Sequence, residues 1–203
     1  MAVKIKKSAQ YILTAILTLC FAVGCAATPP SEPPDYSAAP PAIAQGFHVT
    51  NVETAIVNVP SKAFLVWKEQ AQLSDFLTPT DGMPAVQNTV SLEGGEWGQV
   101  GDKRRVELAD GHYAVETILS STDDKFSYQV WGFTSSAGRF TDYATGEFVY
   151  EDQGDQTLVV WTYRFHPNSF LSRIPLSLFV RNTFQTFMEN GLNNMKAGAE
   201  ASI

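Results

Sequence analysis

Two stretches near the C-terminus decide the fold: residues 157–165 are TLVVWTYRF, and residues 180–199 are VRNTFQTFMENGLNNMKAGA. The first alternates as a strand does, because successive strand side chains point to opposite faces. Its apolar face consists of Val159, Trp161, Tyr163 and Phe165. The second belongs to a tail, residues 174–199, with helical spacing. Its apolar stripe consists of Val180, Phe184, Phe187, Met188, Gly191, Leu192, Met195 and Ala199. Both apolar faces must be buried, so we expect a long terminal helix packed on a sheet.

The preceding chain supplies the rest of that sheet. Residues 48–59 alternate imperfectly between polar and apolar side chains and predict a strand. Helical stretches are expected over residues 63–69 and 72–77. From residue 86 to residue 166, strand-forming residues are interrupted by turn signals at regular intervals, which predicts about six antiparallel strands. Residues 47–203 are therefore expected to form one α+β domain with a long C-terminal helix.

The order of these elements resembles the SRPBCC superfamily, which includes START, Bet v 1 and polyketide cyclase-like proteins. The resemblance covers roughly residues 49–195 and rests on five short stretches in the expected order. They are VPS leading into Phe64 and Trp67, WGQVGDKR at 97–104, LADG at 108–111 followed by Glu116, FSYQV at 126–130, and TLVVWTYRF at 157–165. The resemblance implies a helix-grip fold, a curved antiparallel sheet of about seven strands wrapped on the C-terminal helix. It also implies a hollow between sheet and helix.

A hairpin turn predicts which side chains face that hollow. Asp110-Gly111 is a favoured pair for a two-residue type I′ turn, which would pair Arg105 with Glu116 on the outer face. Arg104 would then point inward beside Val106 as a lone cation among apolar neighbours. It would either anchor a ligand carboxylate or phosphate or, as the sequence favours, reach solvent at the strand end.

The remaining inward residues suit the wall of an apolar cavity. Tyr128 would add a hydroxyl group, and the aromatic strand would face the terminal helix. The predicted ligand-contacting residues are Arg104, Val106, Tyr128, Trp161, Tyr163, Phe165, Phe184, Phe187 and Met188. For any single one of them an ordinary packed core is favoured, whereas the set together favours a cavity, because the resemblance implies a hollow between sheet and helix.

The N-terminus has the pattern of an export signal. Three lysines precede residues 11–23, an uncharged stretch shorter than the about 20 residues that span a bilayer. This stretch leads into FAVGC at residues 21–25, which resembles the bacterial lipobox with Cys25 as the lipidated residue. A lipoprotein signal peptide is therefore expected at residues 1–24. The alternative is a plain secretory signal, and Cys20 is a poorer lipidation candidate because a leucine precedes it.

Lipidation would hold the protein at a membrane. Two or more acyl chains, such as palmitate, give stable attachment where a single chain does not. Residues 26–46 contain six prolines and no apolar periodicity, so residues 25–46 are expected to form a Pro/Ala-rich tether that follows the lipidated cysteine. Ala26 in the position after that cysteine favours the periplasmic face of an outer membrane, if the cell has one.

Composition disfavours several classes of partner. Removing residues 1–24 takes away three of the 14 basic residues and none of the 21 acidic residues, which leaves a formal net charge of −10. This balance disfavours nucleic acid and electrostatic adhesion to anionic lipid. Both cysteines lie within the first 25 residues, so the mature monomer cannot form a disulfide. The three histidines are far apart, and no metal or cofactor is expected.

These observations predict a membrane-anchored envelope protein that binds a hydrophobic small molecule or lipid. Two alternatives stay open. One is an enzyme of the cyclase, dehydratase or hydrolase type that uses Arg104 with Tyr128 or Tyr163. No established catalytic motif is present, but the resemblance implies that one Arg, Tyr or His inside the pocket suffices for cyclase-type chemistry. The other is an envelope scaffold whose hollow is filled by its own side chains. A cavity below about 300 Å³ would favour the scaffold.

Overall fold

The computed structural model describes residues 26–92 and 94–202, and the predicted signal peptide and Cys25 lie outside them. The elements are β1 (Val49–Val57), α2 (Ser61–Gln70), α3 (Leu73–Phe76), β2 (Val86–Ser91), β3 (Lys103–Leu108), β4 (Tyr113–Ser121), β5 (Lys125–Trp131), η1 (Ser136–Arg139), β6 (Thr141–Asp152), β7 (Thr157–Pro167), α4 (Arg173–Phe179), η2 (Val180–Phe184) and α5 (Gln185–Glu200). This order confirms the predicted strand, two short helices, six further strands and long terminal helix.

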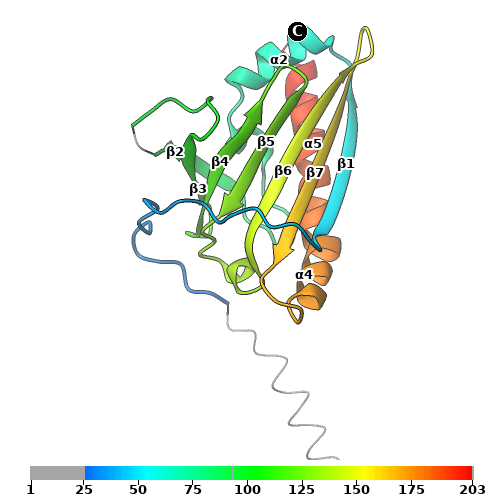
Figure 1. Ribbon diagram of the computed structural model, residues 1–203. Coiled ribbons are helices and arrows are strands. Elements are labelled where there is room, and N and C mark those ends of the chain that lie inside the picture. Colours follow the sequence, from blue (N-terminus) through cyan, green and yellow to red (C-terminus); the bar gives the residue numbers. More distant parts are fainter. Residues whose placement is uncertain (1–25, 93, 203) are drawn as a thin grey trace, which may run out of the picture.

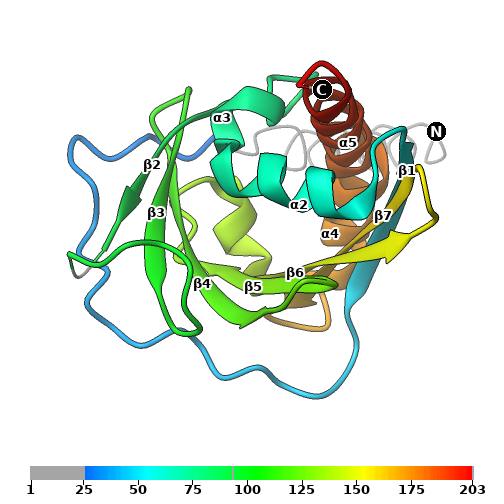
Figure 2. The ribbon, with the colours of Figure 1, turned by 90° about the horizontal axis from the view of Figure 1, so that it is seen from above.

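One antiparallel sheet of seven strands forms the body of the protein. Its strand order is β1-β7-β6-β5-β4-β3-β2, so the first strand pairs with the last. Figure 1 shows α5 running behind the sheet near β1 and β7, and Figure 2 shows the sheet curving around the helical layer. The short helices α2 and α3 lie with α5 on the concave side of the sheet (Figure 2). The fold is therefore the predicted helix-grip arrangement.

The terminal helix buries the predicted stripe. Its three segments follow without a break from residue 173 to residue 200, and η2 is a single π-helical turn. All eight residues of the stripe are buried. Gly191 lets the helix approach its neighbours closely, because a Cβ there would lie 2.9 Å from Leu77 and 3.3 Å from Trp161. The helical period thus predicted the buried face correctly.

The hairpin between β3 and β4 differs from the prediction by one residue. The amide of Leu108 donates to the carbonyl of His112, so the loop holds three residues instead of two. Gly111 takes the left-handed conformation, with φ of 84°, that such a loop requires at its last position. Arg104 therefore pairs with Glu116, and Arg105 pairs with Val115.

This shift reverses the faces of β4, because moving a strand by one residue turns every side chain to the other side. Glu116 faces the hollow and not the outer surface. Val115 lies in a small cluster on the outer face together with Trp131 and Tyr143. The predicted Arg105–Glu116 surface pair is wrong, and Arg105 instead contacts Glu107 at 2.6 Å.

The segment from Tyr36 to Ala44 packs along the outer face of the sheet, where the sequence predicted a tether without such contacts. The Tyr36 ring is 8% exposed, lies against Trp131 and donates its hydroxyl hydrogen to the Gly132 carbonyl at 3.2 Å. The Gln129 amide nitrogen donates to the Pro41 carbonyl at 2.8 Å. A proline-rich backbone makes no internal hydrogen bonds, so its carbonyls are free to accept from sheet side chains. Figure 1 shows this segment, in blue, crossing in front of the strands.

Candidate functional site: a cavity between sheet and helix

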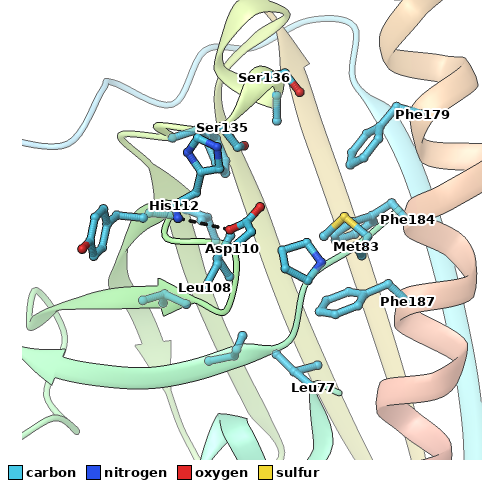
Figure 3. Close-up of a pocket in the computed structure, with 18 of the residues that line it drawn as sticks. Leu77, Met83, Leu108, Asp110, His112, Ser135, Ser136, Phe179, Phe184 and Phe187 are labelled. Carbon is cyan, nitrogen blue, oxygen red and sulfur yellow. Dashed lines mark hydrogen bonds between the residues drawn. The ribbon is translucent and has the colours of Figure 1, made fainter. Parts of the chain in front are cut away.

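A cavity of about 320 Å³ lies between the sheet and the terminal helix. Figure 3 shows Phe179, Phe184 and Phe187 on the helical side, facing Leu108 and His112 on the sheet side. The lining is mostly apolar. It consists of Ala26, Ala27, Leu73, Leu77, Gly82, Met83, Pro84, Val86, Val106, Leu108, Asp110, His112, Tyr113, Ala114, Glu116, Tyr128, Val130, Phe133, Ser135, Ser136, Ala137, Phe140, Trp161, Tyr163, Phe165, Leu176, Phe179, Phe184 and Phe187.

Seven of the nine residues predicted to contact a ligand line this cavity. They are Val106, Tyr128, Trp161, Tyr163, Phe165, Phe184 and Phe187. They come from three strands and the terminal helix, and the strand period and the helix period each identified them correctly as inward-facing. Their contact with a ligand stays a prediction.

Met188 does not line the cavity. Its side chain is fully buried in the core, where the Asn51 amide nitrogen of β1 lies 3.3 Å from its sulfur. Consecutive helical residues point about 100° apart, so Phe187 and Met188 can contact different neighbours. Met188 packs toward β1, and Phe187 faces the cavity.

Arg104 does not line the cavity either. Its guanidinium forms an ion pair with Glu116, with an Nη2–Oε2 distance of 2.6 Å, and Nε donates to the same oxygen at 2.7 Å. It also lies over the Trp97 ring, 4.0 Å from the ring centroid. The two charged side chains are only 14% and 10% exposed. The register of the hairpin places Arg104 opposite the carboxylate of Glu116. Arg104 is therefore neither available to anchor a ligand nor a strand-end side chain that reaches solvent.

Glu116 is the functional candidate that the sequence analysis missed. The predicted register placed it on the outer face, whereas the structure places it in the cavity wall, 7% exposed. Both hydrogen bonds from Arg104 go to Oε2. The described residues offer no hydrogen bond to Oε1. One oxygen of this cavity-lining carboxylate thus has no hydrogen-bond partner among residues 26–92 and 94–202.

Two tyrosines add polar groups to the same wall. Tyr128 and Tyr163 both pair with Gly146 of the strand between them. The Tyr128 hydroxyl accepts a hydrogen bond of 3.1 Å from the Trp161 indole nitrogen. The Tyr163 hydroxyl has no hydrogen bond among residues 26–92 and 94–202. Its ring packs on Phe184 with centroids 4.7 Å apart.

Burial determines the chemical state of these tyrosines. Loss of hydration raises the pKa of both Tyr128 and Tyr163 well above the ordinary value of 10, and the nearby charge of Glu116 raises both further. Both hydroxyl groups therefore keep their protons at neutral pH. They can donate hydrogen bonds to a ligand, but they are not bases.

The mouth of the cavity is more polar than its walls. Figure 3 shows Asp110, His112, Ser135 and Ser136 grouped at one end, on the loops that follow β3 and β5. The His112 ring bridges Thr134 Oγ1 at 3.0 Å and the carbonyl of Ala27 at 3.2 Å. The start of the described chain is thereby held at the mouth.

The part of the chain that the structure describes contains no cluster of three residues able to hold a metal ion. It also has no helix with the length and apolar character needed to cross a bilayer.

Three solved structures share the fold at low identity. Ara h 8.0201 is 14% identical, with a TM-score of 0.56, over 76% of this chain and 99% of that chain. The Zhui aromatase/cyclase from Streptomyces sp. R1128 is 17% identical, with a TM-score of 0.54, over 76% and 94% of the two chains. The major latex-like protein 151 of Panax ginseng is 16% identical, with a TM-score of 0.51, over 73% and 97%. No curated protein matches the sequence.

A family model matches a large part of the sequence. Residues 65–200 match the family described as polyketide cyclase / dehydrase and lipid transport. The matched range runs from α2 to the last residue of α5 and includes most of the cavity wall. The chain therefore belongs to the polyketide cyclase / dehydrase and lipid transport family, within the SRPBCC superfamily.

Proposed function

We propose that this protein binds a hydrophobic small molecule or lipid in the cavity between sheet and helix, while acyl chains on Cys25 hold it at a membrane of the cell envelope. The observation that carries the binding proposal is the cavity itself, about 320 Å³ with a largely apolar lining. Ligand sites in proteins typically have volumes of about 300–1,000 Å³ and this kind of lining. The volume is at the lower end of that range, so a single slender ligand fits best.

Membership of a family described as including lipid transport supports the same proposal. The scaffold alternative requires the protein's own side chains to fill the hollow, and the cavity volume argues against it. The anchor proposal depends on the lipobox-like residues 21–25. It would bring the cavity mouth close to the source of an apolar ligand, since Ala26 and Ala27 line that mouth.

Native mass spectrometry of the protein purified from its own cells tests the binding proposal. We expect an apolar molecule to accompany the protein and to be lost on denaturation. As a second measurement, the uncharged probe N-phenyl-1-naphthylamine should gain fluorescence on entering the cavity. A protein that carries no ligand and takes up no probe would contradict the proposal.

A second function, an enzyme of the cyclase or dehydratase type, is favoured by one observation. One cavity holds the carboxylate of Glu116 and the protonated hydroxyl groups of Tyr128 and Tyr163. A base and donors in such proximity suit proton transfer. Arg104, the earlier catalytic candidate, is occupied by Glu116. Incubating the co-purified molecule with fresh protein decides between the two functions: a carrier returns it unchanged, and an enzyme alters its mass or its retention time.

A further inference from the structure

We infer that the inner wall of the cavity recognises a hydroxyl group on an otherwise apolar ligand, with Glu116 Oε1 as the acceptor and the Tyr163 hydroxyl as the donor. This inference rests on the proposed binding function and specifies its ligand class. The class is a long-chain or polycyclic alcohol rather than a fatty acid anion.

The first step of the argument concerns Glu116. The carboxylate lies in the cavity wall, and Arg104 occupies only its Oε2 atom, with contacts of 2.6 Å and 2.7 Å. A carboxylate oxygen in an apolar wall is a strong acceptor, and covering it with a ligand that offers no donor is unfavourable. A ligand O–H would supply the missing donor.

The second step concerns Tyr163. Its hydroxyl lacks a hydrogen-bond partner within the described ranges, and its ring lies among Trp161, Phe165 and Phe184. The neighbouring Tyr128 hydroxyl already accepts from Trp161. Tyr163 stays protonated because burial raises its pKa. A ligand oxygen can therefore accept from Tyr163 while its own hydrogen goes to Glu116, and a hydroxyl group satisfies both.

The third step excludes a charged head group. A ligand carboxylate would meet the negative charge of Glu116, and the cation able to neutralise it, Arg104, is already paired and lies outside the lining. A ligand ammonium would have to leave water for a site whose ion pair is already neutral overall. An uncharged hydroxyl group avoids both unfavourable terms.

Displacement of N-phenyl-1-naphthylamine by three ligands with the same alkyl tail tests this inference. The ligands are 1-dodecanol, dodecanoate and dodecyl methyl ether, which has the oxygen but no hydrogen to donate. We expect dodecanol to bind about tenfold or more tightly than either of the others, as the loss of a buried hydrogen bond or the presence of like charge implies. This comparison needs only the parent protein.

Two variants test the proposed donor and the proposed acceptor separately. Tyr163→Phe should weaken dodecanol severalfold, whereas Tyr150→Phe, a buried tyrosine outside the cavity lining, should leave it unchanged. Glu116→Gln should reduce the preference for dodecanol over dodecanoate, because the charge that repels the anion is gone. Equal binding of dodecanol and its ether, or tighter binding of dodecanoate, would overturn the inference alone. Failure of the probe and all three ligands to bind would overturn the proposed function as well.

A second inference concerns apolar side chains that are exposed on the surface of the protein and not buried in the cavity. We propose that the β7–α4 tip, defined as Phe170, Leu171, Ile174 and Leu178, docks on an anionic lipid bilayer. These four large apolar side chains are 75%, 80%, 71% and 52% exposed. Figure 1 shows α4 at the end of the molecule opposite the C-terminus, the same end at which the described chain begins.

Charge supports a bilayer as the occupant. The chain has an acidic excess overall, yet no Asp or Glu occurs between residues 156 and 188, a range that contains three arginines. One of them, Arg173, lies over the rings of Phe47 and Phe170, 4.4 Å and 5.0 Å from their centroids. Aromatic and aliphatic side chains flanked by arginine suit the interface of an anionic membrane.

The location of the tip also supports a bilayer. Phe179, which follows the tip residue Leu178 in α4, lines the cavity, and Ala26 lies at the mouth. A bilayer under the tip would therefore meet the cavity mouth and the residue that follows the predicted anchor. Contact between the tip and the bilayer would therefore turn the cavity mouth toward the membrane. A lipid on Cys25 alone would not impose this orientation.

Vesicle flotation tests the tip independently of the anchor. The chain from Ala26 onward lacks Cys25 and contains every described residue. It should float with phosphatidylcholine–phosphatidylglycerol vesicles and less with phosphatidylcholine alone. The double variant Phe170→Ser/Leu171→Ser should lose flotation, whereas Val66→Ser/Val100→Ser, which changes exposed apolar residues elsewhere, should keep it. No flotation of the parent, or equal flotation of both variants, would overturn the proposal in favour of a protein partner or none.

Discussion

The ring of Tyr128 lies directly over Gly146, its partner on the neighbouring strand β6, so closely that any side chain at residue 146 would overlap the ring. This arrangement allows the Tyr128 hydroxyl to cross β6 and meet the indole nitrogen of Trp161 on β7 at 3.1 Å. A missing side chain on one strand thus allows a polar contact across two strands, and that contact fixes the inner wall of the cavity.

Gly146→Ala should displace the Tyr128 ring. We expect a loss of about 1–3 kcal/mol in the free energy of unfolding, as for other over-packed cores, measured by urea titration. Gly95→Ala is the matched control, because a Cβ at Gly95 would meet nothing within 4 Å. Equal stability of the two variants would mean that the ring moves aside without strain.

Removing one partner of the buried ion pair should be strongly unfavourable. Glu116→Ala leaves the Arg104 guanidinium, 14% exposed, without a carboxylate. We expect a loss of about 2–4 kcal/mol in the free energy of unfolding, reduced from the fully buried case by the contact with Trp97 and the remaining exposure. The same measurement on Glu107→Ala, in a more exposed pair with Arg105, should show less than about 1 kcal/mol. Similar losses would contradict the burial of the first pair.

The Tyr36 hydroxyl should lose its proton at a higher pH than an ordinary tyrosine does. Burial raises its pKa to about 12, whereas an unfolded tyrosine titrates near a pH of about 10. The folded protein therefore holds this proton more tightly, so the stabilisation is complete below a pH of about 10 and is lost as the pH rises through the folded value. The difference in tyrosinate absorbance between the parent and Tyr36→Phe isolates this group. A midpoint of about 10 would show that residues 26–46 do not pack on the sheet.

The anchor prediction depends on one residue outside the described ranges. Cys25→Ala removes the sulfur that lipidation requires, and we expect the variant to accumulate as an uncleaved precursor or as soluble protein. Fractionation with immunodetection measures this, and the size of the product shows whether the signal segment is retained. Membrane association of a variant that has lost its signal segment would refute lipidation at Cys25, and the tip would then be the attachment to test.

The sequence was sufficient for the faces of β7 and α5, because each pattern is local: a period of two for the strand and of 3.6 for the helix. It was insufficient for β4, since Asp110-Gly111 is compatible with two-residue and three-residue loops, and the difference of one residue moved Glu116 from the surface to the cavity. Packing of Tyr36 was also unpredictable, because a proline-rich segment has no apolar period to indicate its partner.

The last prediction separates the cavity wall from the core within one turn of α5. Met188 is fully buried toward β1, so Met188→Ala should reduce the free energy of unfolding by about 2–5 kcal/mol. Binding of N-phenyl-1-naphthylamine should be unchanged once the variant is folded. Phe187 lines the cavity, so Phe187→Ala should weaken the probe severalfold.

Stability alone cannot separate the two positions, because phenylalanine removes more apolar surface than methionine when it is truncated. Probe affinity is the deciding measurement, and it is made at a urea concentration where both variants stay folded. Equal loss of affinity at both positions would mean that the core between α5 and β1 is continuous with the cavity. Since the Asn51 amide contacts the Met188 sulfur on the β1 side, we expect that core to stay closed.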